Sequence, residues 1–275
     1  MDWAETAATL ARARAEIPVS FAGPNGELCG ILTPAARKVA SAQRWVAFPG
    51  RPRFGTRRLR VLAARHLAAQ GFSCLRFDLH GSGESAGDAV NPERANPYGD
   101  DVAAAIRYLG KVDRGARILL TGYCFDALSA MAAFEREPET IAGLFFAAAP
   151  IAVQRIDRIA ANAGGGFRGR VAGMLSGRTR QQPPRLSDRF VSSFSALIGS
   201  RASALLIYGT SDYMSAEADL LEQAMRALGD DARRRVILER WQGSLRSVGC
   251  EPAIYERLIS WAMQFYGSAE MRVTA

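Results

Sequence analysis

The segment ILLTGYCFDALSAM (residues 118–131) joins an apolar strand to an amphipathic helix through a very short turn. The apolar run ends at Gly122, Cys124 lies in the turn, and helical periodicity begins at Phe125. A strand–turn–helix of the form small-x-nucleophile-x-small is a nucleophile elbow, which projects its central side chain above a sheet. A lone free cysteine is usually a buried packing residue. Here the context instead predicts that Cys124 is a nucleophile.

The residues beside Cys124 have predicted roles of their own. The backbone N–H of Phe125 would point to where an oxyanion forms, and the helix N-terminus would favour a thiolate. Tyr123 is a candidate substrate-binding residue. Asp126 departs from the pattern, because an elbow normally has a small residue there for close helix packing. We weigh two roles for it, a structural carboxylate at a helix N-terminus and a substitute catalytic group, and favour the structural one.

Strand and helix patterns alternate along the rest of the chain, which predicts an α/β fold with a parallel sheet and helices on both faces. The expected strands are residues 27–33, 44–50, 72–78, 116–122, 141–150, 203–209 and 234–240. The expected helices are residues 57–71, 98–110, 125–137, 215–228 and 252–267. We assign residues 1–150 and 201–275 to this core.

Residues 151–200 interrupt the alternation, since they are far longer than an ordinary connection between a strand and the next element. They contain many arginines, three successive glycines from Gly164 and a Pro183-Pro184 pair. We interpret them as an inserted, basic, mostly helical lid over the site. The competing interpretation is a solvated surface insertion.

Three further segments appear in an order that resembles the α/β-hydrolase superfamily. They are FPGRPRFG (48–55), DLHGSGES (78–85) and YGTSD (208–212). The resemblance implies an eight-stranded, mostly parallel sheet, a catalytic acid at Asp212 and a second oxyanion N–H from Arg51. Residues 49–57, GYCFDA and GTSDYMSAE also resemble small bacterial hydrolases associated with exosortase A systems. A biological role does not transfer on such a resemblance.

The superfamily places its catalytic histidine after the last strand, and here Arg246 occupies the matching position. The chain has two histidines. His66 lies in a predicted helix and is expected to be a surface or packing residue. His80 lies in the DLHGSGES turn, where an ordinary turn residue is the better expectation, yet it is the one histidine near enough to act as a base. Arg246 could pair with Asp212 or bind an anionic substrate group.

A cysteine nucleophile without its histidine favours particular chemistry. An ordinary thiol has a pKa of about 8.5, so a few per cent is thiolate at neutral pH and can attack a thioester unaided. Hydrolysis of the acyl-enzyme needs a general base for water. We therefore predict an acyltransferase or thioesterase-like enzyme. Two alternatives remain: a lyase or cyclase of natural-product biosynthesis with Asp126, Glu239 or Asp212 as base, and a pseudoenzyme that only binds.

Composition limits the partners. Hydrophobic residues make up 48% of the chain and the net charge is +8, almost wholly from arginine. This charge would attract an acyl group carried on coenzyme A or an acyl carrier protein. No motif indicates nucleic acid, a metal or another cofactor, and no segment is apolar enough to span a membrane. We expect a cytoplasmic protein, whose apolar C-terminal helix ending in WAMQFYG could pair two chains as a homodimer.

Overall fold

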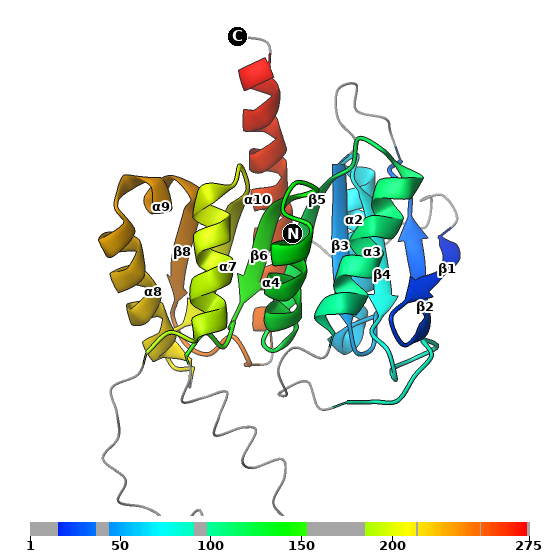
Figure 1. Ribbon diagram of the computed structural model, residues 1–275, viewed down its shortest axis with the longest axis horizontal. Coiled ribbons are helices and arrows are strands. Elements are labelled where there is room, and N and C mark those ends of the chain that lie inside the picture. The colour runs from blue at the N-terminus through cyan, green and yellow to red at the C-terminus, as the bar shows by residue number, and fades with distance from the viewer. Residues whose placement is uncertain are drawn as a thin grey trace, which may run out of the picture.

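The computed structural model describes residues 16–36, 44–90, 98–152, 185–212, 214–247 and 249–273. Its strands form one eight-stranded sheet in the order β1-β2-β4-β3-β5-β6-β7-β8 (Figure 1). Strand β2 is antiparallel to β1 and β4, and every other pair is parallel. The prediction of an eight-stranded, mostly parallel sheet is confirmed.

The strands are β1 Ile17–Gly23, β2 Gly26–Thr33, β3 Arg44–Gly50, β4 Ser73–Asp78, β5 Arg117–Tyr123, β6 Ile141–Ala147, β7 Ser203–Gly209 and β8 Val236–Trp241. The helices are the 3-10 turn η1 Thr56–Arg58, α2 Leu59–Ala69, α3 Gly99–Val112, α4 Asp126–Arg136, α7 Asp188–Gly199, α8 Ser215–Leu228, α9 Asp230–Arg235 and α10 Cys250–Val273. Most predicted elements occur within a few residues of their expected bounds. Strand β1 and helices α7 and α9 were not predicted.

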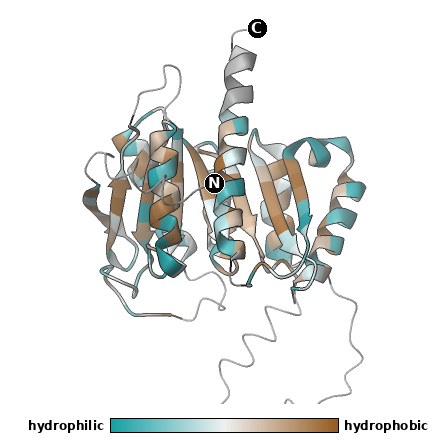
Figure 2. Ribbon diagram, turned by 180° about the vertical axis from the view of Figure 1, so that it is seen from behind, coloured by the Kyte–Doolittle hydropathy of each residue, from teal (hydrophilic) through white to brown (hydrophobic). Residues whose placement is uncertain are grey.

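Helices cover both faces of the sheet, as expected. Figure 1 shows α3, α4 and α7 on the near face, and the reverse view in Figure 2 brings α10 to the front. The central strands are brown with apolar residues in Figure 2, because they are buried between these two layers. Every residue of β6 is buried, including Phe145 and Phe146.

Helix α7 changes the boundary of the predicted insertion. Ser187 caps the helix, with its hydroxyl accepting a hydrogen bond from the Phe190 amide at 3.2 Å. Phe190, Phe194 and Leu197 are buried in the main hydrophobic core. The last part of the segment 151–200 therefore belongs to the core layers. The rest of the predicted lid, residues 153–184, lies outside the described residues and stays a prediction.

Helix α10 packs its apolar face within its own chain. Trp261 and Tyr266 are buried, and Trp261 lies against Phe145 of the sheet with ring centroids 6.1 Å apart. These aromatic side chains are the ones that suggested pairing with a second chain. The homodimer stays a prediction.

Because β3 to β8 are parallel, their carboxyl ends lie along one edge of the sheet. The turn after β5, the loop after β7 and the loop after β8 therefore meet there, and they carry the residues predicted to form the site.

Candidate functional site

Cys124 occupies a sharp turn between β5 and α4. Its backbone φ is 55°, in the left-handed region that a residue with a side chain rarely adopts. The amide of Cys124 donates to the Ala147 carbonyl at 2.9 Å, and its own carbonyl accepts from the Ala127 amide at 3.1 Å. The turn is thus held by both the neighbouring strand β6 and the helix that follows. This is the strained strand-to-helix turn expected of a nucleophile elbow.

Gly122 explains why the elbow can be so tight. A Cβ atom at this position would lie 2.5 Å from the Ala127 Cα, which is backbone and cannot move aside cheaply. Glycine therefore lets the first turn of α4 approach the end of β5. The close packing that the sequence pattern assigned to the residue two positions after the nucleophile, here Asp126, is provided by Gly122, two positions before it.

A pocket of about 200 Å³ opens at the elbow. Its lining residues come from four segments: Tyr123, Cys124, Phe125, Ala148, Asp212, Met214 and Arg246. The pocket therefore brings together the predicted nucleophile Cys124, the predicted acid Asp212 and Arg246, which occupies the position of the superfamily histidine. Tyr123 and Phe125, on either side of Cys124, line it as well. Met214 and Ala148 had no signal in the sequence.

Asp212 is buried at this pocket and is held by the loop after β8. One carboxylate oxygen accepts a short hydrogen bond from the Ser244 hydroxyl, and the other accepts from the Leu245 amide at 3.0 Å. In the superfamily pattern this loop carries the catalytic histidine. Here the Ser244 hydroxyl and the Leu245 amide of the loop orient the Asp212 carboxylate instead.

Tyr123 joins the elbow to that loop. Its hydroxyl donates to the Leu245 carbonyl at 3.2 Å. Burial raises the pKa of Tyr123 strongly, and the nearby charges of Cys124, Glu251 and Asp212 raise it further, while Arg246 opposes them. Tyr123 therefore remains a neutral hydrogen-bond donor over the physiological range. Arg246 is exposed and lines the mouth of the pocket.

Asp126 does not line the pocket with Cys124. One of its oxygens accepts from the Arg60 Nη2 at 2.8 Å, and the other lies 3.9 Å from the Arg51 guanidinium. Arg60 is buried in α2, and nothing in its helical sequence context indicated this long-range partner. The pairing supports the structural role preferred for Asp126 and joins the elbow helix to the loop after β3.

His80 is held by Asp101 of helix α3, away from Cys124. Its Nδ1 lies 2.8 Å from Asp101 Oδ2, whose oxygen also accepts from the His80 amide at 2.7 Å. The ring packs against Tyr98 at 4.7 Å between centroids, and the Tyr98 ring also contacts the Arg51 guanidinium, 4.8 Å from the ring centroid. His80 is not among the residues lining the Cys124 pocket. Its contacts make it a support for the loop after β3.

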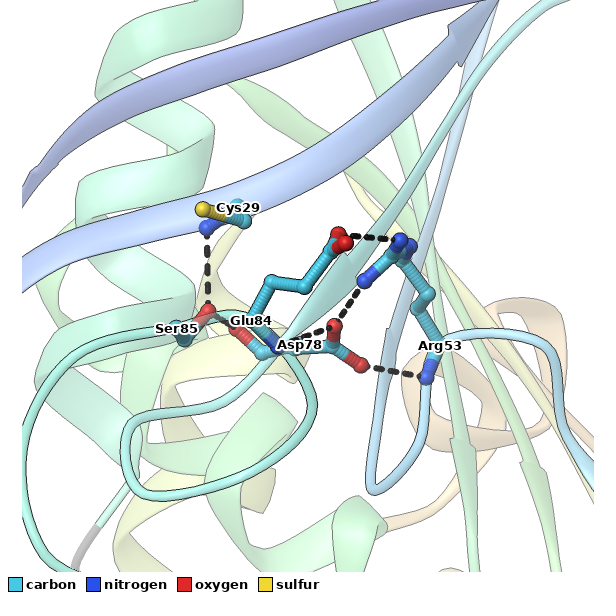
Figure 3. Close-up of polar contacts among 5 residues, drawn as sticks. All are labelled: Cys29, Arg53, Asp78, Glu84 and Ser85. Carbon is cyan, nitrogen blue, oxygen red and sulfur yellow. Dashed lines mark hydrogen bonds and ion pairs between the residues drawn. The ribbon is translucent and has the colours of Figure 1, made fainter.

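A cluster of polar contacts anchors the same loop, as Figure 3 shows. The Arg53 amide donates to Asp78 Oδ1 at 2.7 Å, and its guanidinium pairs with Asp78 and Glu84. Ser85 donates to the Asp78 carbonyl at 2.7 Å and accepts from the Cys29 amide at 2.9 Å. The loop that carries Arg51, the second predicted oxyanion donor, is therefore rigidly attached to the turn after β4.

Comparison with known proteins agrees with this geometry. A family model described as serine aminopeptidase, S33, matches residues 56–193, half of the chain, including the elbow. The chain belongs to this family. No curated protein matches its sequence.

Solved structures show the same fold over nearly the full length of this S33 family member. An esterase of Pyrococcus furiosus has a TM-score of 0.61 at 15% identity, covering 95% of this chain and 94% of that one. Est1E of Butyrivibrio proteoclasticus, solved with ferulic acid, has a TM-score of 0.60 at 16% identity, covering 91% and 98%. A lidless α/β serine hydrolase from Xanthomonas campestris has a TM-score of 0.54 at 16% identity, covering 91% and 93%.

This S33 family member carries cysteine at the elbow of a family named for serine. Glu239, considered above as a base, accepts hydrogen bonds from Trp241 and Arg257 and does not line the pocket. Among the described residues no cluster of three or more side chains could hold a metal ion. No helix within those residues is both long and apolar enough to cross a membrane.

Proposed function

We propose that this protein is an enzyme that takes an acyl group from a thioester or ester onto Cys124 and passes it to an acceptor. One observation carries the proposal: Cys124 lies at a strained elbow in the same pocket as Asp212 and Arg246. A structural cysteine would need neither the left-handed backbone nor the pocket. Strain of this kind persists where the surroundings enforce it, commonly at catalytic sites.

The first step follows from the elbow. The Cys124 thiolate attacks the acyl carbonyl carbon, and the resulting oxyanion accepts hydrogen bonds from the Phe125 amide and the amide of Arg51. Collapse of this intermediate forms the Cys124 thioester and expels the thiolate or alkoxide of the donor, with its electron pair. The Phe125 amide precedes the first turn of α4, where helix amides lack partners within the helix.

The second step favours transfer over rapid hydrolysis. Water needs a general base to attack a thioester, and the described residues that line the pocket include no histidine. Asp212, the buried carboxylate there, already accepts two hydrogen bonds from the loop after β8. A thiol or amine acceptor depends less on such a base, so acyl transfer or slow thioester hydrolysis is the expected outcome. Arg246 at the pocket mouth suits a donor or acceptor with a carboxylate or phosphate.

The two alternatives have less support. A lyase or cyclase would use Asp126, Glu239 or Asp212 as base, yet each of these carboxylates is engaged by neighbouring donors. A pseudoenzyme that only binds would have little use for the strained backbone that holds Cys124 at the pocket.

Intact-mass spectrometry after incubation with short and medium acyl thioesters tests the proposal. The wild type should gain the mass of one acyl group, and Cys124→Ala should gain none. Cys250→Ala is the matched control, because Cys250 is another partly exposed cysteine and does not line the pocket. It should acylate like the wild type. An adduct that survives Cys124→Ala, or no adduct on the wild type with any donor, would overturn the proposal.

A further inference from the structure

A surface pocket with a volume of about 360 Å³ lies between the loop after β3, helix α2 and strands β2 and β4. Four arginines line it, and we call it the arginine pocket: Arg53, Arg58, Arg65 and Arg76. It shares no lining residue with the Cys124 pocket, and the proposed acyl transfer makes no use of it. Its volume is that of an ordinary site for a small ligand.

One carboxylate serves two of these arginines. Glu16 accepts hydrogen bonds from Arg65 at 3.0 Å and from Arg76 at 2.8 Å, and it is the one carboxylate among the described residues that line the pocket. Burial and the nearby charge of Arg65 hold the pKa of Arg76 below its ordinary value, although the Glu16 charge opposes them. The two guanidiniums are therefore incompletely neutralised by Glu16.

Arg58 is the most accessible cation of the arginine pocket. It is exposed, and the ion pairs that the described residues form at this pocket belong to the other three arginines. Arg65 is also accessible, since its side chain is 32% exposed. Glu16 engages Nε and Nη2 of Arg65, and Nη1 takes part in no hydrogen bond with a described residue. Two guanidiniums can therefore reach a ligand in the pocket.

An apolar surface lies in the same pocket. The Phe54 ring is 49% exposed, and Ile31 of β2 and Val61 of α2 line the pocket as well. A face of an aromatic ring binds other planar groups by stacking, whatever their hydrogen-bonding pattern. The pocket thus offers exposed positive charge and a flat apolar surface together.

A phosphomonoester matches the charged part of this lining. It carries about −1.5 to −2 charge at neutral pH and three acceptor oxygens, so it can bind two guanidiniums at once. A simple carboxylate has one charge and two oxygens, and it would compensate the arginines less completely.

We propose that the arginine pocket binds a small phosphomonoester that carries a planar ring, with its phosphate on Arg58 and Arg65 and its ring on Phe54. Arg76, whose side chain is 4% exposed, contributes positive charge from behind and no direct contact. Binding requires no acyl-enzyme, so the site is independent of the Cys124 chemistry.

Calorimetric titration of the full chain tests this with adenosine monophosphate, ribose 5-phosphate, inorganic phosphate, adenosine and acetate. Salt at about 0.15 M screens long-range attraction between exposed charges. We expect adenosine monophosphate to bind saturably, about tenfold more tightly than ribose 5-phosphate or inorganic phosphate, with adenosine and acetate weaker still. Adenosine monophosphate that binds no more tightly than adenosine or ribose 5-phosphate, or no saturable binding of any phosphate, would overturn the proposal.

Substitution then locates the site. Arg58→Gln should weaken binding of adenosine monophosphate about tenfold. Arg57→Gln is the matched control, because Arg57 is an exposed neighbour with the same left-handed backbone and does not line the pocket. Each variant removes one positive charge, so a difference between them reports the site and not the net charge. Equal weakening in the two variants, or none in Arg58→Gln, would contradict the assignment.

Two further variants separate the parts of the proposal. Phe54→Leu removes the aromatic face and should abolish the preference for adenosine monophosphate over ribose 5-phosphate while leaving inorganic phosphate binding unchanged. A preference that survives Phe54→Leu would refute the placement of the ring. Cys124→Ala should bind adenosine monophosphate like the wild type, which distinguishes failure of this site from failure of acyl transfer.

Discussion

The backbone of Cys124 places an unusual demand on the residue type at that position. At φ 55° a Cβ atom is strained, and glycine alone escapes the strain. At an ordinary position glycine is less stabilising than alanine by about 0.5–1 kcal/mol, because it loses more backbone freedom on folding. The order should therefore reverse at Cys124.

We predict that Cys124→Gly is more stable than Cys124→Ala by about 1 kcal/mol, while both lose acyl-enzyme formation. Urea denaturation followed by circular dichroism measures the stability difference between the two variants. An alanine variant as stable as the glycine variant or more stable would show that the left-handed turn is not maintained in solution.

Gly122 should tolerate no side chain. Gly122→Ala would force its Cβ into the backbone of Ala127, and we expect a loss of about 1–3 kcal/mol in the free energy of unfolding. The matched control is Gly110→Ala on α3, where a Cβ meets nothing within 4 Å. That variant should gain about 0.5–1 kcal/mol. Denaturant midpoints of the two variants should shift in opposite directions.

Single residues also show the limit of inference from sequence. Cys124 and Asp212 were predicted for the site because they end recognisable segments, and both line one pocket. The partners of His80 and Asp126 are Asp101 and Arg60, which lie 21 and 66 positions away along the chain. Local pattern carries no information on such pairs, so these two roles needed the folded arrangement.

At the scale of elements, the carboxylate of Glu16, just before β1, links helix α2 to strand β4. Glu16 accepts hydrogen bonds from Arg65 on α2, at 3.0 and 3.1 Å, and from Arg76 on β4, at 2.8 Å. Arg76 is 3% exposed. Burial alone would raise the pKa of Glu16, yet the hydrogen bonds and charges of the two arginines outweigh it and lower the pKa below its ordinary 4.5.

This shift predicts an acid-sensitive contribution to stability. A carboxyl group whose pKa is lower in the folded state binds fewer protons there, so its stabilisation is present above pH 4.5 and is lost as the pH falls through the folded-state pKa. We expect Glu16→Gln to cost about 3 kcal/mol at pH 7, since it leaves the buried Arg76 without its charge partner. The difference in melting temperature between wild type and variant should shrink progressively as the pH falls below 4.5. A constant difference across this range would refute the assignment.

Two elements were missed for identifiable physical reasons. Strand β1 buries only Phe21 among its seven residues, so its apolar pattern is weak and its identity depends on pairing with β2. Helix α7 lies in an arginine-rich segment whose composition indicated an insertion. Its cap at Ser187 and the spacing of Phe190, Phe194 and Leu197 were a usable signal.

For the molecule as a whole, the fold was predictable because strands and helices alternate strongly and the landmark turns occur in a recognisable order. A mostly parallel sheet and its two helical layers followed from that alternation, whereas the strand order needed the structure. The pocket lined by Arg60, Tyr123, Phe145 and Leu258 was not predictable, because its walls come from α2, β5, β6 and α10, which are distant in sequence.

The net charge of +8 gives a prediction at this scale. If the acyl donor is carried on an anionic group, acylation of Cys124 by an acyl-coenzyme A should slow as salt rises from about 0.05 to about 0.5 M, because charge attraction is screened. Acylation by the matching N-acetylcysteamine thioester, which is uncharged, should change little. Rates come from time-resolved intact mass. The same salt dependence for both donors would show that the basic charge does not steer the substrate.

Helix α10 has a practical consequence for measurement. Its 24 residues span about 36 Å at 1.5 Å per residue, and its far end projects beyond the sheet (Figure 1). Its first turn contributes Glu251 to a pocket between α10, α2 and the sheet. A dye or surface tether attached near residue 273 would therefore stand well clear of that pocket and of the Cys124 pocket. Immobilised or fluorescently tagged protein should therefore keep the Cys124 acylation rate of the free chain, which makes the end of α10 a suitable attachment point for single-molecule or sensor work.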